Sequence, residues 1–390
     1  MDFTIPYELR ELVSSLNKFI GNEVKPLQEA HQDEDGNVPE EIRKQVRLRS
    51  YALGFYGADF PVEYGGGGLS TLGMTLLREA LGMSGVPIAD AVLGEAGALS
   101  DILLECNEGQ REKYLFPTIR AEKLSCFALT EPNAGSDTAA IETTAVKDGD
   151  HYLLNGRKHF ISNAPYADFA IVFTATDKKL RARGGITCFL VDKGTPGFSL
   201  GRTHRHMGED DRLGELIFED CRVPAENVLG KVGEGFFLAM MRVGQGRLRL
   251  AAFFTGLADL CLQLALDYSK IRVQFGKPIS SYQAIRWMLA DMSLELQASR
   301  LMLYHAAWKA DQGQDVTRES GMVKLYSSEL FRRAADKALQ IHGGMGYMKD
   351  CPTERLYRLA RATTIGEGTS EIQRIIIARR LLQEGPLRFL

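Results

Sequence analysis

The cysteines of this chain form no recognisable set. Six occur among 390 residues, and none stands in a Cys-x-x-Cys pair. The sequence therefore offers neither a zinc knuckle nor a redox dithiol. We expect reduced, buried cysteines that pack as small hydrophobic side chains, as in a cytoplasmic protein. They are Cys106, Cys126, Cys188, Cys221, Cys261 and Cys351.

A metal centre is also not expected. His204 and His206 supply half a site at most, and the sequence shows no third ligand at a suitable spacing. A solvent-exposed loop is the simpler interpretation of these two histidines.

Charge and hydropathy exclude further classes. The net charge of −3 gives no basic surface for nucleic acid or for an anionic membrane. We find no uninterrupted apolar run long enough to cross a bilayer, and no secretory or transit signal at the start. With 45% hydrophobic residues, the composition is that of a globular protein, and we expect a cytoplasmic, bacterial-type location.

Hydrophobic periodicity divides the chain into three parts. Residues 1–125 repeat their apolar positions every three to four residues, which predicts helices, among them one over 90–106 that is rich in small residues. Residues 126–232 change to a period of two. The dipeptides Asp148-Gly149 and Asn155-Gly156 predict hairpin turns between strands at 142–147, 151–154 and 158–162. Further strands are expected at 169–174, 187–191 and 214–218.

Residues 233–390 return to the helical period. Helices are predicted over 248–269, 283–311, 323–341 and 371–382. We therefore predict a mostly helical α+β protein. Its parts would be an N-terminal helical domain (1–125), a central antiparallel β-sandwich or barrel (126–232) and a C-terminal up-and-down four-helix bundle (233–390).

Two polar, glycine-containing segments stand out in this frame. One follows a strand-like run and offers the hydroxyls of Thr130 and Ser136. The other places Glu367 between two glycines, with hydroxyls just beyond it. A carboxylate flanked by glycines leaves backbone and space open to a ligand.

Together with three further motifs, these segments resemble the acyl-CoA dehydrogenase family, flavoenzymes that oxidise acyl-CoA thioesters. The resemblance extends from near the N-terminus to about Leu382, and it implies the same helical, β and helical order. The motifs, in sequence order, are Ala128-Leu-Thr-Glu-Pro-x-Ala-Gly-Ser-Asp137, Asn155-Gly-x-Lys-x-x-Ile-Ser-Asn163, Arg272-x-Gln-Phe-Gly276, Gln340-Ile-His-Gly-Gly344 and Glu367-Gly-Thr-Ser-Glu-Ile-Gln373.

The resemblance implies FAD as the cofactor. An isoalloxazine ring needs an apolar face to stack on and donors directed at its edge. Phe160 would supply the face, unless it is only a core residue, and the hydroxyls would supply donors, unless they only form turns. The residues implied to line the flavin are Phe127, Leu129, Thr130, Gly135, Ser136, Phe160, Ile161 and Ser162.

A second group is implied to reach the FAD of a neighbouring subunit. The planar fork of Arg272 suits a pyrophosphate, and Gly343-Gly344 would allow a close backbone approach or simply cap a helix. Thr369 and Glu371 resemble adenine-side and pyrophosphate contacts. The remaining members of this group are Gln274, Phe275, Gln283, Gln340 and Ile341.

Glu367 is the candidate catalytic base. The α-proton of a thioester is weakly acidic, and a carboxylate becomes a stronger base in a water-excluded pocket. In the family, the backbone N–H of the base and a flavin hydroxyl bind the thioester carbonyl, and a hydride passes from the β-carbon to the flavin. Some members carry the base on an earlier helix, but that position is Gly246 here. The alternative is an ordinary surface glutamate.

Substrate contacts are implied for Ser136, Gly368, Arg247, Gly244 and Leu93, the last at the base of an acyl pocket formed by the 90–106 helix. Two departures from the family weaken these details. Gly244 stands where relatives often have an aspartate that contacts CoA, and the loop over 207–215 is one residue short.

We therefore predict an FAD-dependent acyl-CoA dehydrogenase. Its electrons would pass to an electron-transferring flavoprotein, and the assembly would be a homotetramer, a dimer of dimers. The alternatives are a flavin oxidase or monooxygenase of the same fold, or a non-catalytic flavoprotein in an assembly. The length, branching or aromaticity of the acyl chain and the choice between CoA and an acyl carrier protein stay open.

Overall fold

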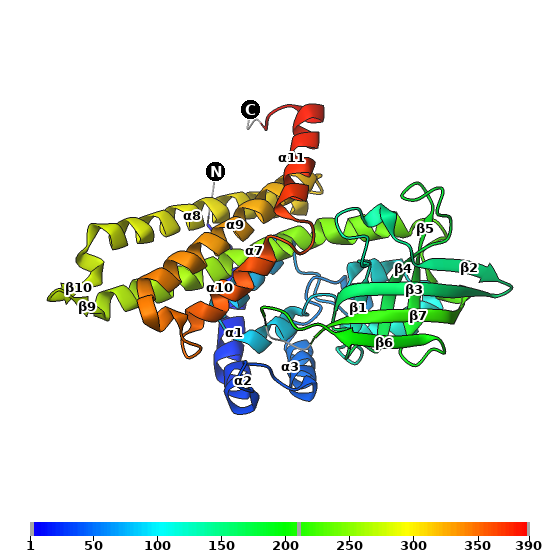
Figure 1. The fold of residues 1–390 in the computed structure, drawn as a ribbon, viewed down its shortest axis with the longest axis horizontal. Helices are drawn as coiled ribbons and strands as arrows, with labels where there is room; N and C mark the ends of the chain where they lie inside the picture. Colours follow the sequence, from blue (N-terminus) through cyan, green and yellow to red (C-terminus); the bar gives the residue numbers. More distant parts are fainter. Residues whose placement is uncertain (1–3, 209–211, 388–390) are drawn as a thin grey trace. The chain divides into compact units, whose positions relative to one another are not determined.

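The computed structural model describes residues 4–208 and 212–387 (Figure 1). Two compact units emerge. The helical unit comprises Met1–Lys25, Ser70–Val86 and Gly244–Leu390, and the β unit comprises Pro26–Leu69 and Pro87–Val243. The predicted mostly helical α+β class, with helical segments before and after a central sheet, is confirmed.

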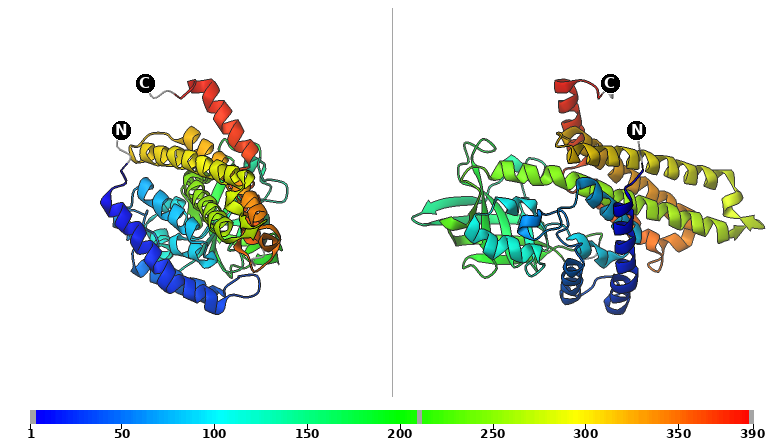
Figure 2. Two further views of the ribbon diagram at one scale, coloured as in Figure 1. Left: turned by 90° about the vertical axis from the view of Figure 1, so that its left-hand side faces the viewer. Right: turned by 180° about the vertical axis from the view of Figure 1, so that it is seen from behind.

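Most of the helical unit consists of helices. They are α1 (Tyr7–Phe19), α4 (Thr71–Ser84), most of α7 (Gly235–Ile271), α8 (Gln283–Asp311), α9 (Thr317–His342), α10 (Pro352–Thr363) and α11 (Ser370–Glu384). Both views of the fold show α8 and α9 running side by side (Figures 1 and 2). Their shared core includes Leu257, Met292 and Phe331.

Two glycines allow close contact between α7 and α4. A Cβ at Gly256 would lie 2.0 Å from the carbonyl oxygen of Glu79, and one at Gly82 would lie 2.3 Å from that of Phe253. Only glycine fits at these positions, because no real Cβ approaches a backbone oxygen so closely. This contact fixes α4 against the bundle.

Helix α7 has the length and apolar composition of a membrane-spanning helix, although the sequence showed no uninterrupted apolar run. Half of its apolar stretch is buried inside the protein. A core helix of a bundle has the same features, so this is weak evidence for a span.

The β unit contains one eight-stranded sheet in the order β6-β7-β3-β2-β4-β5-β8, with β1 pairing parallel to β4. The strands are β1 (Ser125–Ala128), β2 (Thr144–Asp148), β3 (His151–Ser162), β4 (Phe169–Ala175), β5 (Ile186–Asp192), β6 (Phe198–Thr203), β7 (Leu213–Pro224) and β8 (Val228–Leu229). All other pairs are antiparallel except a single β2–β4 contact.

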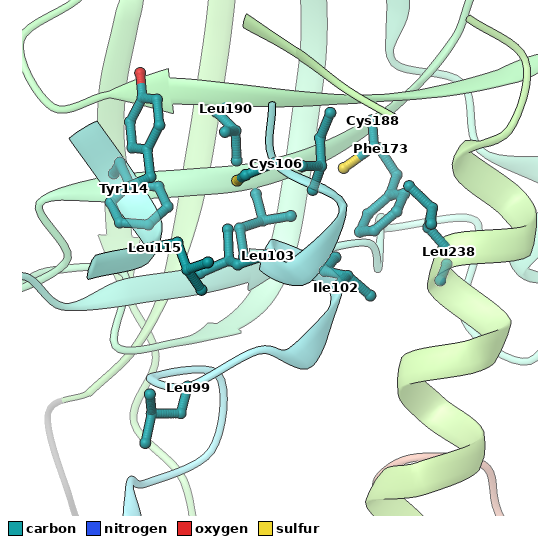
Figure 3. Packing of buried hydrophobic residues seen from close by; sticks show 14 of the residues in the cluster. Leu99, Ile102, Leu103, Cys106, Tyr114, Leu115, Phe173, Cys188, Leu190 and Leu238 are labelled. Carbon is teal, nitrogen blue, oxygen red and sulfur yellow. The ribbon is translucent and has the colours of Figure 1, made fainter. Parts of the chain in front are cut away.

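One face of this sheet packs on short helical segments. Figure 3 shows Leu103, Phe173 and Leu190 pointing into the same apolar cluster. The helices of this unit are α3 (Glu40–Ala52), α5 (Glu108–Gln110) and α6 (Phe116–Ile119), and α2 (Lys25–His31) lies almost wholly within it. All six cysteines are buried and free, as expected.

Two predictions of local structure were wrong. Residues 90–106 form no helix but two 3₁₀ segments, Pro87–Leu93 and Asp101–Glu105. Gly94 and Gly97 between them have φ values of +77° and +83°, which break a helix. Asn155-Gly156 is not a turn. β3 continues through this dipeptide with a bulge. The glycine is required there because a Cβ at Gly156 would lie only 2.6 Å from Thr143.

Candidate functional site

A buried ion pair holds the loop that follows β1. Lys158 on β3 and Glu131 in the loop are 2.7 Å apart, and their side chains are 0% and 3% exposed. Lys158 also donates to the carbonyl of Leu129 at 3.2 Å, and the backbone N–H of Thr143 donates to Glu131 at 3.0 Å. The loop carrying Thr130, Gly135 and Ser136 is thus tied to two strands.

Burial and charge act in opposite directions on this pair. Burial lowers the pKa of Lys158 to about 8, although the Glu131 charge opposes that shift. Burial alone would raise the pKa of Glu131, but the charge and hydrogen bond of Lys158 outweigh it and lower that pKa. Both groups are therefore ionised at neutral pH.

Phe160 presents its ring to the surface. The residue has φ +56° and is 56% exposed, which is unusual for a large apolar side chain near the middle of a sheet. The imidazoles of His159 and His204 lie 4.0 Å and 4.9 Å from its ring. Of the neighbouring predicted residues, Ile161 is buried and Ser162 is half-buried.

His204 has two neighbouring side chains that the sequence did not reveal. His159, His204 and Glu215 place possible metal-ligand atoms within 4.8 Å of one another, so the expectation of no third ligand was wrong. However, Glu215 already lies 2.9 Å from His159 and 3.1 Å from Arg202. Burial lowers the pKa of His204, and the charges of His159 and Arg202 lower it further. Because Glu215 is already paired with the guanidinium of Arg202, we assign no metal here.

In the helical unit, Glu367 lies in the tight loop between α10 and α11. Glu367 and Gly368 have φ values of +50° and +89°. A glutamate seldom adopts this left-handed conformation, which persists only where the surroundings enforce it. The carboxylate oxygen Oε2 is buried, and no described residue forms a hydrogen bond to it.

Two cations accompany this carboxylate. Arg247 on α7 is 8% exposed; burial lowers its pKa while the charge of Glu367 raises it. Lys324 on α9 is fully buried, and Glu367 is its strongest ionic partner. Gly244 lies one turn before Arg247, and a Cβ there would meet nothing within 4 Å.

Most of the residues predicted to reach the FAD of a neighbouring subunit lie elsewhere on the helical unit. Residues 272–278 form a hairpin of β9 (Val273–Gln274) and β10 (Lys277–Pro278), with Phe275 94% exposed at its tip. Its base is next to the end of α9, because Tyr268 stacks on His342 at 4.3 Å. Gln340, Gly343 and Gly344 are exposed there, whereas Ile341 is buried.

This group is far from Glu367. Lys324, which contacts Gly368, and His342 are eighteen residues apart on α9, or about 27 Å along a helix. Thr369 and Glu371, by contrast, adjoin Glu367, and Thr369 caps α11. One chain therefore carries two separate sets of predicted residues in this unit.

The remaining predicted residues divide as follows. Leu93 is 1% exposed and lies in a 3₁₀ segment of the β unit. Phe127 packs on Phe173 at 5.0 Å, and Gln283 is exposed at the start of α8. Of the shortened loop over 207–215, residues 209–211 lie outside the described residues.

Sequence reasoning missed four residues that support the two loops. Glu131, Lys158 and Gln373 belong to quoted motifs but received no role. Lys324 was not considered at all. No signal in the sequence marks Lys324, because its neighbours at helical spacing on α9 are small or polar, namely Gly321, Ser327 and Ser328.

Comparisons with known proteins cover nearly the whole chain. The family models described as acyl-CoA dehydrogenase N-terminal, middle and C-terminal domains match residues 6–122, 126–221 and 233–382. The probable acyl-CoA dehydrogenase YngJ of Bacillus subtilis is 40% identical over 98% of this chain and 100% of its own length.

Two further relatives also match most of the chain. The caffeyl-CoA reductase-Etf complex subunit CarC of Acetobacterium woodii is 42% identical over 90% of this chain and 92% of its own. The solved structure of butyryl-CoA dehydrogenase from Megasphaera elsdenii has a TM-score of 0.88 at 36% identity, and the match covers 98% of this chain and 100% of that one.

Proposed function

Because the chain belongs to the acyl-CoA dehydrogenase family, and is thus an oxidoreductase of an FAD-dependent family, we propose that it oxidises an acyl-CoA thioester to the α,β-unsaturated product with Glu367 as the catalytic base. The division into domains at residues 125 and 232 and the cytoplasmic location stay predictions.

The observation that carries the proposal is the state of the Glu367 carboxylate. Its Oε2 is buried and has no hydrogen-bond partner among the described residues. A buried, unpartnered carboxylate oxygen is costly for stability, and a catalytic role is one reason for a folded protein to keep such a group. Glu367 is thus ready to accept the α-proton of a bound thioester.

The backbone around Glu367 offers a second element. Within the part of the chain that the structure describes, no group accepts a hydrogen bond from the N–H of Glu367. That N–H is available to the thioester carbonyl, where it would stabilise the negative charge that develops as the α-proton leaves.

The β unit has the features that an FAD site requires. Phe160 exposes an apolar ring for stacking, and the hydroxyls of Thr130, Ser136 and Ser162 make no hydrogen bond to any described residue. They are free to act as donors to the polar edge of the ring. Bound FAD would supply the acceptor for the hydride of the β-carbon.

We propose a homotetramer in which the hairpin over 272–278 and the segment 340–344 reach the FAD of a neighbouring subunit. Two observations support this assembly. These segments lie about 27 Å along α9 from the Glu367 loop. In addition, α8 exposes an apolar stripe at seven-residue spacing: Trp287, Leu294, Leu301 and Trp308 are 61%, 72%, 48% and 52% exposed. Such a stripe fits burial by another helix.

An electron-transferring flavoprotein is the proposed electron acceptor. The support is the name of the CarC relative, which is a subunit of a reductase-Etf complex. The same name favours a second candidate, reduction of an unsaturated acyl-CoA. That reaction is the reverse of the first, so Glu367 would then deliver the α-proton.

Anaerobic bleaching of the flavin tests the proposal. The purified protein is mixed with short, long, branched and aromatic acyl-CoAs, and flavin absorbance is followed. We expect at least one to bleach the parent protein, Glu367→Gln to abolish bleaching while retaining FAD, and the matched control Glu384→Gln to behave as the parent. Bleaching by Glu367→Gln at the parent rate would assign proton abstraction to another residue.

Anaerobic bleaching and a second measurement, the reaction of the reduced enzyme with oxygen, separate the alternatives. If no acyl-CoA bleaches a yellow protein, a non-catalytic flavoprotein is favoured. If the reduced enzyme reacts with oxygen as fast as it turns over, an oxidase is favoured.

A further inference from the structure

A lysine is fully buried beside the Glu367 loop. Lys324 lies in the second turn of α9 and is 0% exposed. Fully buried lysines are rare unless they are paired. Its Nζ forms one side-chain hydrogen bond, to the carbonyl oxygen of Gly368 at 2.8 Å. The ammonium therefore contacts the residue next to the proposed base.

A second buried donor acts on the same turn. Gln373 on α11 is also 0% exposed, and its Nε2 lies 3.0 Å from the Gly368 carbonyl and 3.4 Å from that of Glu367. Two side chains from different helices thus hold consecutive carbonyls of a left-handed turn. Their hydrogen bonds offset the cost of placing Glu367 at positive φ.

The position of the turn is fixed further along α9. The hydroxyl of Ser370 donates to Glu329 at 2.9 Å, five residues beyond Lys324. The turn is therefore attached to α9 at two points, of which only Lys324 brings a positive charge.

The charges around Lys324 define its electrostatic role. Burial lowers the pKa of Lys324 to about 8; Glu367 opposes this shift most strongly, Arg247 on α7 reinforces it, and Glu329 on α9 and Glu371 on α11 oppose it more weakly. Lys324 is thus still an ammonium at neutral pH.

We propose that Lys324 is a positioning residue for the catalytic base: its charge-assisted hydrogen bond to the Gly368 carbonyl fixes the Glu367–Gly368 turn and so holds the Glu367 carboxylate in place. This rests on the proposed role of Glu367. A merely structural lysine would stabilise the fold without changing the rate of proton transfer at saturating substrate.

The first test separates the limiting rate of flavin bleaching from substrate affinity. Lys324→Met should bleach roughly 10- to 100-fold more slowly at saturating substrate, because the carboxylate is no longer held in place. Its substrate affinity should be little changed. Lys337→Met, the same substitution at a surface ion pair on α9, should match the parent.

Two companion variants test the hydrogen bonds to the turn. Lys324→Gln can still donate to the carbonyl, so it should lose less of the bleaching rate than Lys324→Met, and it replaces Lys324→Met if that variant does not fold. Gln373→Leu removes the second donor to the Gly368 carbonyl and should also slow bleaching with little change in affinity.

A readout independent of activity completes the design. Hydrogen exchange followed by mass spectrometry reports how firmly the Glu367–Gly368 turn is held in the holoenzyme. We expect the peptide that contains this turn to exchange faster in Lys324→Met than in Lys337→Met. Parent-like exchange and parent-like bleaching in both Lys324 variants would overturn the inference. Full bleaching by Glu367→Gln would instead refute the proposed base, and hydrogen exchange would still decide the effect of Lys324 on the turn.

Discussion

Replacing the buried Lys158 by methionine should destabilise the protein far more than the loss of a surface lysine would. The variant leaves Glu131 buried, at 3% side-chain exposure, without its cation. Breaking such a pair costs about 3–5 kcal/mol. Glu131 keeps hydrogen bonds from the backbone N–H groups of Glu142 and Thr143, so we expect the lower end, about 3 kcal/mol.

Thermal and urea unfolding measure this effect. If the 390 residues unfold together, the unfolding entropy is about 0.8 kcal/mol/K, and 3 kcal/mol lowers the midpoint by about 4 °C. Lys147→Met, at an exposed position on β2, is the matched control and should change the midpoint by less than about 1 °C.

A double variant tests the reason for the loss. Adding Glu131→Gln to Lys158→Met removes the orphaned charge and should recover more than half of the stability. A loss below about 1 kcal/mol in the single variant, or no recovery in the double one, would refute the argument that an uncompensated buried carboxylate causes the effect.

Three further outcomes follow from the structure. Gly256→Ala should lower the midpoint of thermal unfolding by several degrees, since its Cβ would lie 2.0 Å from a carbonyl oxygen, whereas Gly21→Ala, with nothing within 4 Å, should not. The pKa of Lys324 is lowered to about 8, so the native state releases this proton before the unfolded state. Its contribution to stability therefore rises between about pH 8 and 10.4, by up to about 3 kcal/mol, and Lys324→Met should abolish that rise in urea titrations. Leu294→Glu, in the exposed stripe of α8, should reduce the oligomeric state in analytical ultracentrifugation; an unchanged mass would exclude this stripe from the interface.

Regular periodicity made much of the fold predictable. The helix predicted over 283–311 has these bounds, because its apolar face is continuous and a glycine follows its end. The turn at Asp148-Gly149 is correct, since β2 and β3 meet there. By contrast, α10 was missed, although Pro352 stands in its first turn and Leu356 and Ala360 are buried along one face.

Tertiary contacts explain where the sequence was misleading. Asn155-Gly156 has the composition of a hairpin turn, but its glycine is required by the close approach of Thr143. His159 and Glu215 join His204 only because β3 and β7 are adjacent in the sheet. Glu367 could be singled out from its neighbouring glycines. Its contact through Gly368 with Lys324, 44 residues earlier in the chain, could not.

Exchange of the α-proton tests the central claim most directly. The oxidised holoenzyme is incubated in D₂O with an acyl-CoA whose β-carbon carries no hydrogen, so that proton abstraction can occur without oxidation, and deuterium incorporation is followed by NMR. The account predicts exchange by the parent and by Glu384→Gln and none by Glu367→Gln. Exchange by Glu367→Gln at the parent rate would contradict it.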